Sequence, residues 1–200
     1  AAIIPELPEM IVLCQFSDSY ILAEGDGELL IIDQHALHER IRYERLRQSM
    51  VDWSPQELII PIPISLGVRE LAAARSESNR LSELGFDFSE LDEVILVTSV
   101  PAVLLGDSSL TEFIHDILID ISSHPESNGV DTVEKLRDKV AFMRSCRGSV
   151  KANQKLNLSE MRRLLLDMRT VPNPWACVHG RPTILRLTQV HMDKHFGRHG

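Results

Sequence analysis

The sequence lacks a run of 18 apolar residues, and it has no N-terminal stretch typical of a secretory signal peptide. A membrane-spanning helix needs about 20 consecutive apolar residues, so we expect no membrane insertion. The chain begins with Ala rather than Met. Together these features predict a soluble segment of a longer protein.

Cysteine is scarce, since the 200 residues contain three. An odd number without a secretory signal argues against a disulfide framework and for a reducing, intracellular setting in which thiols serve as metal ligands. Cys14 ends the apolar run Met10–Cys14. We expect this cysteine to be an inert core residue.

Positive charge is also limited, because 21 Lys and Arg residues stand against 29 Asp and Glu residues and leave a net charge of −8. Non-specific affinity for nucleic acids comes mostly from cations that neutralise phosphates. We therefore expect the chain to bind DNA weakly by itself, so that any activity on DNA would depend on another domain or partner.

Apolar residues make up 44% of the chain, enough for one good-sized domain or two small ones. Their spacing predicts strands at 10–17, 20–24 and 28–32, which Gly25–Gly27 would help to join into an antiparallel meander. A helix from about 34 to 50 follows, and further helices and strands continue to the end. The pattern predicts a mixed α+β fold.

The junction between the third strand and this helix concentrates polar residues. Four apolar residues end at Ile32, and Asp33, His35 and Glu39 follow. Asp33 would lie at or just before the helix N-cap. His35 and Glu39 are four residues apart, so they would share one helix face, within reach of a single metal ion. A capped helix with a surface His–Glu pair is the alternative.

The same helix has an apolar stripe and a second histidine. The residues that we expect to face the sheet are Ala36, Tyr43, Leu46 and Met50. His38 lies about 300° around the helix from His35, and we expect it to be exposed.

Two segments far downstream add ligands of another kind. Cys146 follows Ser145, and Cys177 precedes His179 by two residues. Thiolates, imidazoles and carboxylates are the ligands that zinc and related divalent ions take. We expect the three segments to form one site for two ions, with these six ligands: Asp33, His35, Glu39, Cys146, Cys177 and His179.

These motifs resemble the C-terminal endonuclease domain of the MutL mismatch-repair family. The family's signature Asp-Gln-His-Ala-x-x-Glu-x-x-x-x-Glu matches Asp33–Glu44 in full. Its Ala-Cys-Arg and Cys-Pro-His-Gly-Arg-Pro motifs match residues 145–147 and 177–182 with one change each, serine for alanine and valine for proline. A Phe-x-Arg element of the family has a counterpart in Phe196–Arg198.

The resemblance implies a divalent-metal-dependent endonuclease that nicks DNA strands in mismatch repair, with Asp33, His35 and Glu39 as catalytic residues. Carboxylates suit Mn²⁺ or Mg²⁺, which would support nicking, and the thiolates suit a structural or regulatory Zn²⁺. The alternatives are a non-catalytic, zinc-stapled dimerisation and docking module and a zinc hydrolase that acts on another substrate.

The resemblance also implies the partners of the chain. They are double-stranded DNA, a second copy of the chain in a homodimer, the replication sliding clamp and, through the full-length protein, a MutS-type mismatch-recognition protein. The implied location is a prokaryotic cytoplasm, in association with the nucleoid.

One short segment resembles the peptide by which bacterial members of the family dock on the sliding clamp, although its register is one residue short. Its candidate clamp-binding residues are Gln56, Leu58, Ile59 and Pro61. An aliphatic, strand-like ligand suits a hydrophobic groove. The alternative is an edge strand closed by Pro61 and Pro63.

A basic stripe is expected on a helix running from about 131 to 153. Arg144, Arg147, Lys151 and Lys155 follow one another at helical spacing. Arg147 and Lys151 are the candidates for contacts with DNA phosphates, because they lie near Cys146. A solvated helix face is the alternative.

The order of these elements predicts two lobes. Residues 1–60 and 156–200 would form one lobe, which carries most of the metal site. Residues 61–155 would be inserted into it as a second lobe, which contributes Cys146. The resemblance implies that the first lobe mediates dimerisation and that the second is regulatory.

Overall fold

The computed structural model describes residues 7–49, 53–91, 94–106, 109–123, 133–150 and 153–198. Helices and two antiparallel sheets confirm the predicted mixed α+β class. The chain divides into two compact units, the first formed by Ala1–Arg45 with Ser145–Gly200 and the second by Leu46–Arg144. These boundaries lie earlier in the chain than the predicted 60/61 and 155/156, and Cys146 therefore belongs to the first unit rather than the second.

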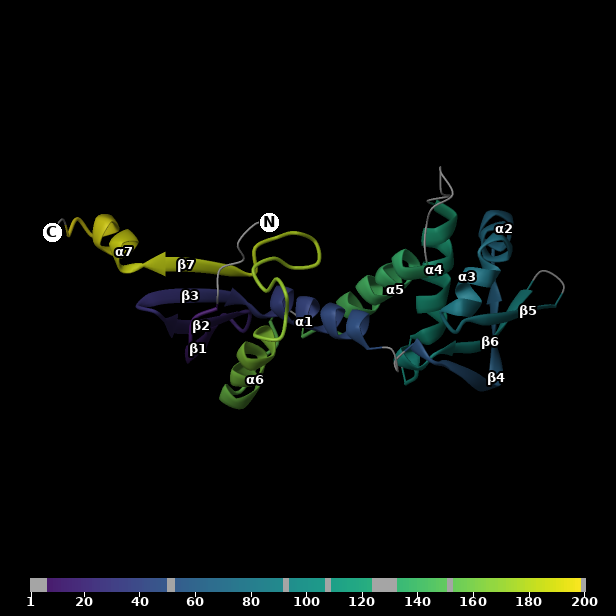
Figure 1. The fold of residues 1–200 in the computed structure, drawn as a ribbon, viewed down its shortest axis with the longest axis horizontal. Coiled ribbons are helices and arrows are strands. Elements are labelled where there is room, and N and C mark those ends of the chain that lie inside the picture. Colours follow the sequence, from purple (N-terminus) through teal and green to yellow (C-terminus); the bar gives the residue numbers. More distant parts are fainter. Residues whose placement is uncertain are drawn as a thin grey trace. The chain divides into compact units, whose positions relative to one another are not determined.

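The first unit is built on a four-stranded antiparallel sheet, in the order β1-β2-β3-β7 (Figure 1). Its strands are β1 (Ile11–Phe16), β2 (Tyr20–Gly25), β3 (Glu28–Asp33) and β7 (Ile184–Thr188). The first three form the predicted meander, with Gly27 at φ +73° in the second turn, where a residue without Cβ is least strained. Cys14 is exposed on the edge strand β1, so the prediction of a core cysteine was wrong.

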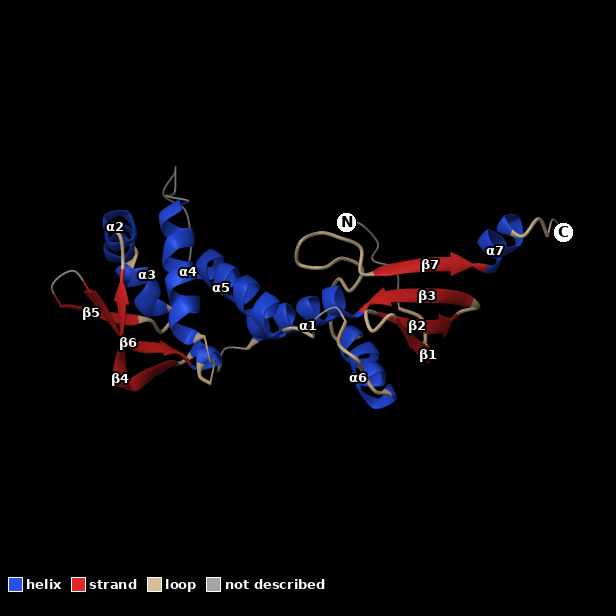
Figure 2. Cartoon of the chain, turned by 180° about the vertical axis from the view of Figure 1, so that it is seen from behind, coloured by secondary structure: helices blue, strands red, loops and turns tan. Residues whose placement is uncertain are grey.

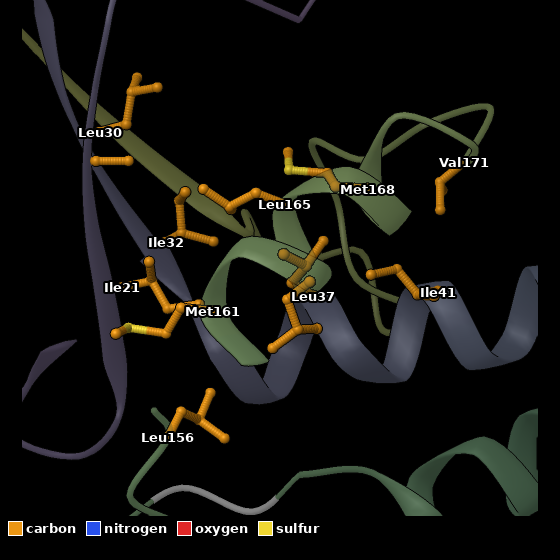
Figure 3. Packing of buried hydrophobic residues seen from close by; sticks show 12 residues of the cluster. Ile21, Leu30, Ile32, Leu37, Ile41, Leu156, Met161, Leu165, Met168 and Val171 are labelled. Carbon is orange, nitrogen blue, oxygen red and sulfur yellow. The ribbon is translucent and has the colours of Figure 1, made fainter. Parts of the chain in front are cut away.

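Two helices supply the partner surface for this sheet: α1 (Gln34–Gln48) and α6 (Leu158–Met168). Asn157 and Glu160 close a capping box at the start of α6, which fixes where that helix begins. Figure 3 shows side chains of the two helices converging on those of β2 and β3. The buried cluster consists of Ile21, Ala23, Leu30, Ile32, Leu37, Ile41, Leu156, Met161, Leu164, Leu165, Met168 and Val171.

The face of α1 that enters this core is not the predicted one. Leu37 and Ile41, four residues apart, are 0% and 1% exposed and belong to the cluster. Of the predicted stripe, Ala36 is buried, Tyr43 is half-buried and Met50 lies outside the described residues. Leu46 is buried within the second unit.

The second unit contains a three-stranded antiparallel sheet, in the order β4-β6-β5, with helices beside it (Figure 2). Its strands are β4 (Pro55–Ser65), β5 (Asp87–Leu91) and β6 (Val94–Pro101). Its helical segments are α2 (Val68–Ser76), α3 (Ser78–Glu83), a 3-10 turn η2 (Ala102–Leu104), α4 (Leu110–Ser123) and most of α5 (Val133–Gly148).

Helix α5 ends at Gly148, so the predicted helix to residue 153 was too long. Arg144 and Arg147 lie on α5, whereas Lys155 is exposed beyond its end, and a single helical stripe from 144 to 155 does not form. Lys151 lies outside the described residues. A short helix α7 (Gln189–His195) follows β7. Throughout the described ranges, every helix is too short or too polar to span a lipid bilayer.

Candidate metal centre

Asp33 is the N-cap residue of helix α1, which carries His35 and Glu39. Its Oδ1 accepts hydrogen bonds from the backbone amides of His35 and Ala36, both at 3.0 Å, which is the geometry of an N-cap. Because β3 runs directly into this cap, the sheet fixes where the first turn of α1 begins. His35 and Glu39 then lie one turn apart on the same helix face.

Glu39 is the centre of the cluster. It is only 4% exposed, and its two carboxylate oxygens face two imidazoles. Oε1 lies 3.3 Å from Nε2 of His35, and Oε2 lies 3.6 Å from Nδ1 of His179. The same carboxylate acts on the Cys146 thiol through its charge and a side-chain hydrogen bond, both of which raise the pKa of the thiol, and Cys177 raises it further. Three of the other predicted ligands, His35, His179 and Cys146, are therefore gathered around the buried carboxylate of Glu39.

The protonation of Cys146 reflects these surroundings. Burial, followed by the negative charge of Glu39, raises the pKa of the Cys146 thiol to about 11. The thiol is consequently neutral at pH 7. A bound divalent cation would lower the pKa of this thiol, because a thiol that coordinates a metal ion is deprotonated.

A tight loop presents Cys177 and His179. The Cys177 amide donates to the carbonyl of Arg181 at 2.8 Å, and the Gly180 amide donates to the carbonyl of Cys177 at 3.0 Å. Gly180 has φ +78°, a backbone conformation that favours glycine. Thr183 anchors the loop, because its carbonyl accepts from the amide of Asp33 at 2.9 Å. The loop is thus fixed to the β3–α1 junction from which His35 and Glu39 also come.

As it stands, no group of three or more His, Cys, Asp and Glu side chains in the described ranges is arranged to hold a metal ion. The donor set nevertheless fits one. Ligands about 2.0–2.1 Å from a tetrahedral ion are roughly 3.3 Å apart, close to the distance from Glu39 to His35. Thiol, imidazole and carboxylate donors are those that zinc prefers.

The other predicted residues lie elsewhere. Oδ1 of Asp33 serves the cap, and the described residues show no contact between its carboxylate and Glu39. Glu44, which ends the signature motif and was not a predicted ligand, pairs with Arg40 at 2.7 Å. Arg147 is exposed in the last turn of α5.

Sequence reasoning missed two residues of α1 that position this cluster. Gln34 is 0% exposed, and its amide nitrogen donates to the carbonyls of Asp18 and Gln154. His38 was expected to be exposed, but it is half-buried, and its Nδ1 accepts from the Val150 amide at 2.6 Å. Desolvation, then the positive charges of Arg42 and Arg45, lowers the pKa of His38 to about 4. A polar residue directly after a buried strand was the available signal for Gln34.

The fold and the cluster define an α+β domain with a candidate metal centre at a strand–helix junction. The chain matches the family described as the MutL C-terminal dimerisation domain over residues 13–156. It is 36% identical over 189 residues to the DNA mismatch repair protein MutL of Xanthomonas campestris pv. campestris (strain B100), covering 93% of this chain and 30% of that protein. It is 35% identical to the protein of the same name from Xylella fastidiosa (strain M23), with the same coverage of both chains.

The chain therefore belongs to the MutL family of DNA mismatch-repair proteins. It spans about 30% of the length of these relatives.

Proposed function

We propose that this chain is the metal-dependent DNA-nicking domain of a mismatch-repair protein. The observation that carries the proposal is the arrangement around Glu39, where two imidazoles and a thiol meet one buried carboxylate. Burying a carboxylate is costly unless it is paired or coordinates a cation. A cation site therefore explains why Glu39 lies inside.

The predicted ligands divide by chemistry. Glu39 and His35, joined by Asp33 as the family resemblance implies, would hold Mn²⁺ or Mg²⁺, and Cys146, Cys177 and His179 would hold Zn²⁺. Bound divalent ions supply a water activated near neutral pH and stabilise charge on the phosphate oxygens. The chain's own residues keep the centre in place: Asp33 fixes the first turn of α1, and the Cys177–Arg181 loop fixes His179.

The test is nicking of supercoiled plasmid by the chain with Mn²⁺, with and without sliding clamp. We expect Glu39→Gln and Asp33→Asn to lower the nicking rate at least about 100-fold, because each removes a charged oxygen ligand. Glu24→Gln, at an exposed position of β2, is the matched control and should nick like the parent chain.

Zinc content by elemental analysis, with and without Cys177→Ala, provides a second measurement. Bound zinc in a chain that never nicks, even with clamp present, would support the non-catalytic docking module instead. Nicking that persists in Glu39→Gln would show that the wrong residues were chosen.

Homodimerisation is proposed through the sheet face that α1 and α6 leave open. An apolar groove lies on that face, lined by Phe16, Tyr20, Leu22, Leu29, Ile31, Asp33, Pro182, Thr183, Ile184 and Leu185. Phe16 and Leu185 are each 57% exposed. Contiguous exposed apolar residues of this kind mark protein–protein interfaces. A second copy suits the groove because the matched family is described as a dimerisation domain.

Cys14 reports on this dimer. It pairs with Leu22 in the β1–β2 register, so both side chains lie on the groove face. Maleimide labelling of Cys14 should slow as the chain concentration rises through the dimer dissociation constant, whereas Cys177 is buried throughout. Cys14→Ser gives the background labelling. A labelling rate independent of concentration, in a chain that sediments as a dimer, would place the interface elsewhere.

Docking to the sliding clamp is proposed for β4. The β4–β6 register is interrupted between Glu57 and Ile62, and Ile59 is fully exposed within this stretch. The strand continues past Pro61 and Pro63 to Ser65, so these prolines do not close it. We expect Ile59→Ala to weaken clamp binding at least tenfold in a pull-down titration. Val68→Ala, at another exposed aliphatic residue of this unit, should have no effect.

Phosphate contact is proposed for Arg147, together with Lys151. We expect Arg147→Ala to weaken binding to double-stranded DNA at every sequence and to reduce the salt dependence by about one counterion. Cooperation with a MutS-type partner and action at the nucleoid would require the full-length protein, because the chain covers 30% of its relatives.

A further inference from the structure

Two histidines of α1, His35 and His38, both form hydrogen bonds with the backbone of Val150. Val150 follows the end of α5, and its carbonyl lies 2.8 Å from Nδ1 of His35. Its amide donates to Nδ1 of His38 at 2.6 Å. His35 and His38 are one helical turn apart, so both imidazoles reach the backbone of Val150 from the same side of α1, one at its carbonyl and the other at its amide. We call this arrangement of His35, His38 and Val150 the histidine clamp.

The donor and acceptor roles in the two contacts determine which nitrogen of each imidazole carries a proton. A carbonyl can only accept, so Nδ1 of His35 carries a proton and donates it to Val150. Nε2 of His35 is then the nitrogen that faces Glu39, at 3.3 Å, and it is the nitrogen available to a metal ion. An amide can only donate, so Nδ1 of His38 is unprotonated.

The clamp also fixes the segment that carries Cys146. Val150 lies four residues after Cys146, and Ser149 lies between them. The Ser149 hydroxyl donates to the Cys146 carbonyl at 3.3 Å and lies 3.2 Å from Nδ1 of His35. Movement of Val150 would therefore disturb the His35 ring and the Cys146 backbone together.

We propose that His38 is a positioning residue of the metal centre, which acts through Val150 to orient His35 and the Cys146 segment. This inference rests on the proposed metal-dependent function. His38 stands at one of the positions of the signature motif at which the pattern specifies no residue type. Partners that orient a metal-bound histidine typically change metal affinity 10- to 100-fold when removed.

The test compares two variants of the chain. His38→Leu removes the acceptor but keeps an apolar side chain of similar size, and His38→Asn places an amide oxygen close to the position of Nδ1. We expect His38→Leu to accelerate hydrogen exchange of the Val150 amide at least about tenfold and to weaken Zn²⁺ and Mn²⁺ binding about 10- to 100-fold, measured by chelator competition. His38→Asn should restore both to within about threefold.

The ¹⁵N spectrum of His35 gives a readout that general destabilisation does not move. In the parent chain and in His38→Asn the neutral ring should be the Nδ1–H tautomer, and in His38→Leu it should become a mixture. If His38→Leu proves unfolded by circular dichroism, His38→Ala and the Asn variant take its place in the same comparison.

The outcomes separate this proposal from the nuclease proposal. If the parent chain binds metal but never nicks, the nuclease proposal fails, while metal affinity and the His35 tautomer still decide the role of His38. Unchanged metal affinity and an unchanged His35 tautomer in His38→Leu, with faster exchange at Val150, would overturn the positioning role. Unchanged exchange at Val150 would overturn the clamp itself.

Discussion

The two faces of the four-stranded sheet differ in what covers them. On one face Ile21 and Ile32 are 0% exposed beneath α1 and α6, while on the other Phe16 and Leu185 remain 57% exposed in an open groove. Alternation along β3 separates the two, because Ile32 points into the core and Ile31 lines the groove. One strand thus supports the helix that carries Glu39 and also contributes to the exposed apolar groove that we propose as the dimer interface.

The largest expected effect follows from that alternation. We expect Ile32→Ala to lower the free energy of unfolding by about 2–4 kcal/mol, because it leaves a cavity in a fully buried core. Ile31→Ala, one residue away on the groove face, should cost less than about 1 kcal/mol in the dilute chain. Urea denaturation of both variants measures the difference. Equal losses would mean that the groove face is covered within a single chain.

The next effect tests the groove face. Leu185→Asp places a charge in the groove, and we expect it to weaken self-association at least tenfold, or about 1.4 kcal/mol, in sedimentation equilibrium. Its circular dichroism spectrum should stay that of the parent chain, because Leu185 makes no part of the core cluster. Leu166→Asp, at a 61% exposed position of α6, is the control and should leave self-association intact.

The sequence predicted the strands of the sheet and the placement of His35 and Glu39 on one face of α1 correctly, but not which side chains of α1 and β1 are buried. Strand alternation and turn glycines gave the meander, and Asp33 in its N-cap position set the spacing of His35 and Glu39. The expectation that Cys146, Cys177 and His179 meet Glu39 came from ligand chemistry and resemblance, and the structure brings His179 and Cys146 to Glu39. Local rules were sufficient for the meander and for the spacing of Asp33, His35 and Glu39, because each of these motifs lies within one hairpin or one turn.

The errors have a common physical cause. Tertiary packing, and not helical periodicity alone, decided that Leu37 and Ile41 enter the core and that His38 is half-buried beside Val150. Cys14 was expected in the core because the residues before it are apolar, yet it pairs with Leu22 on the open face, while Val12 packs against the core. A single sequence cannot distinguish an apolar strand that faces a core from one that faces a partner.

The smallest expected effect is a pH dependence of the free energy of unfolding. It comes from His38 on α1, the helix that covers one face of the sheet. The pKa of His38 is lowered from 6.5 to about 4 by burial, by Arg42 and Arg45 and, less, by His35, while Asp167 opposes the shift. Between these values the unfolded chain binds a proton at His38 and the folded chain does not. The free energy of unfolding should therefore fall as the pH drops from 6.5 towards 4. The stabilisation that comes from a neutral, buried His38 is fully present only above pH 6.5.

The half-exposed side chain limits the size of this loss. One pKa unit corresponds to about 1.4 kcal/mol, and solvent screening reduces the total for His38 to about 1 kcal/mol. Urea denaturation of the metal-free chain at several pH values, with His38→Asn as the reference, isolates the contribution because asparagine does not titrate in this range. The two stability curves should diverge below pH 6.5, with the parent chain losing more. Parallel curves would mean that His38 is as solvated in the folded chain as in the unfolded one.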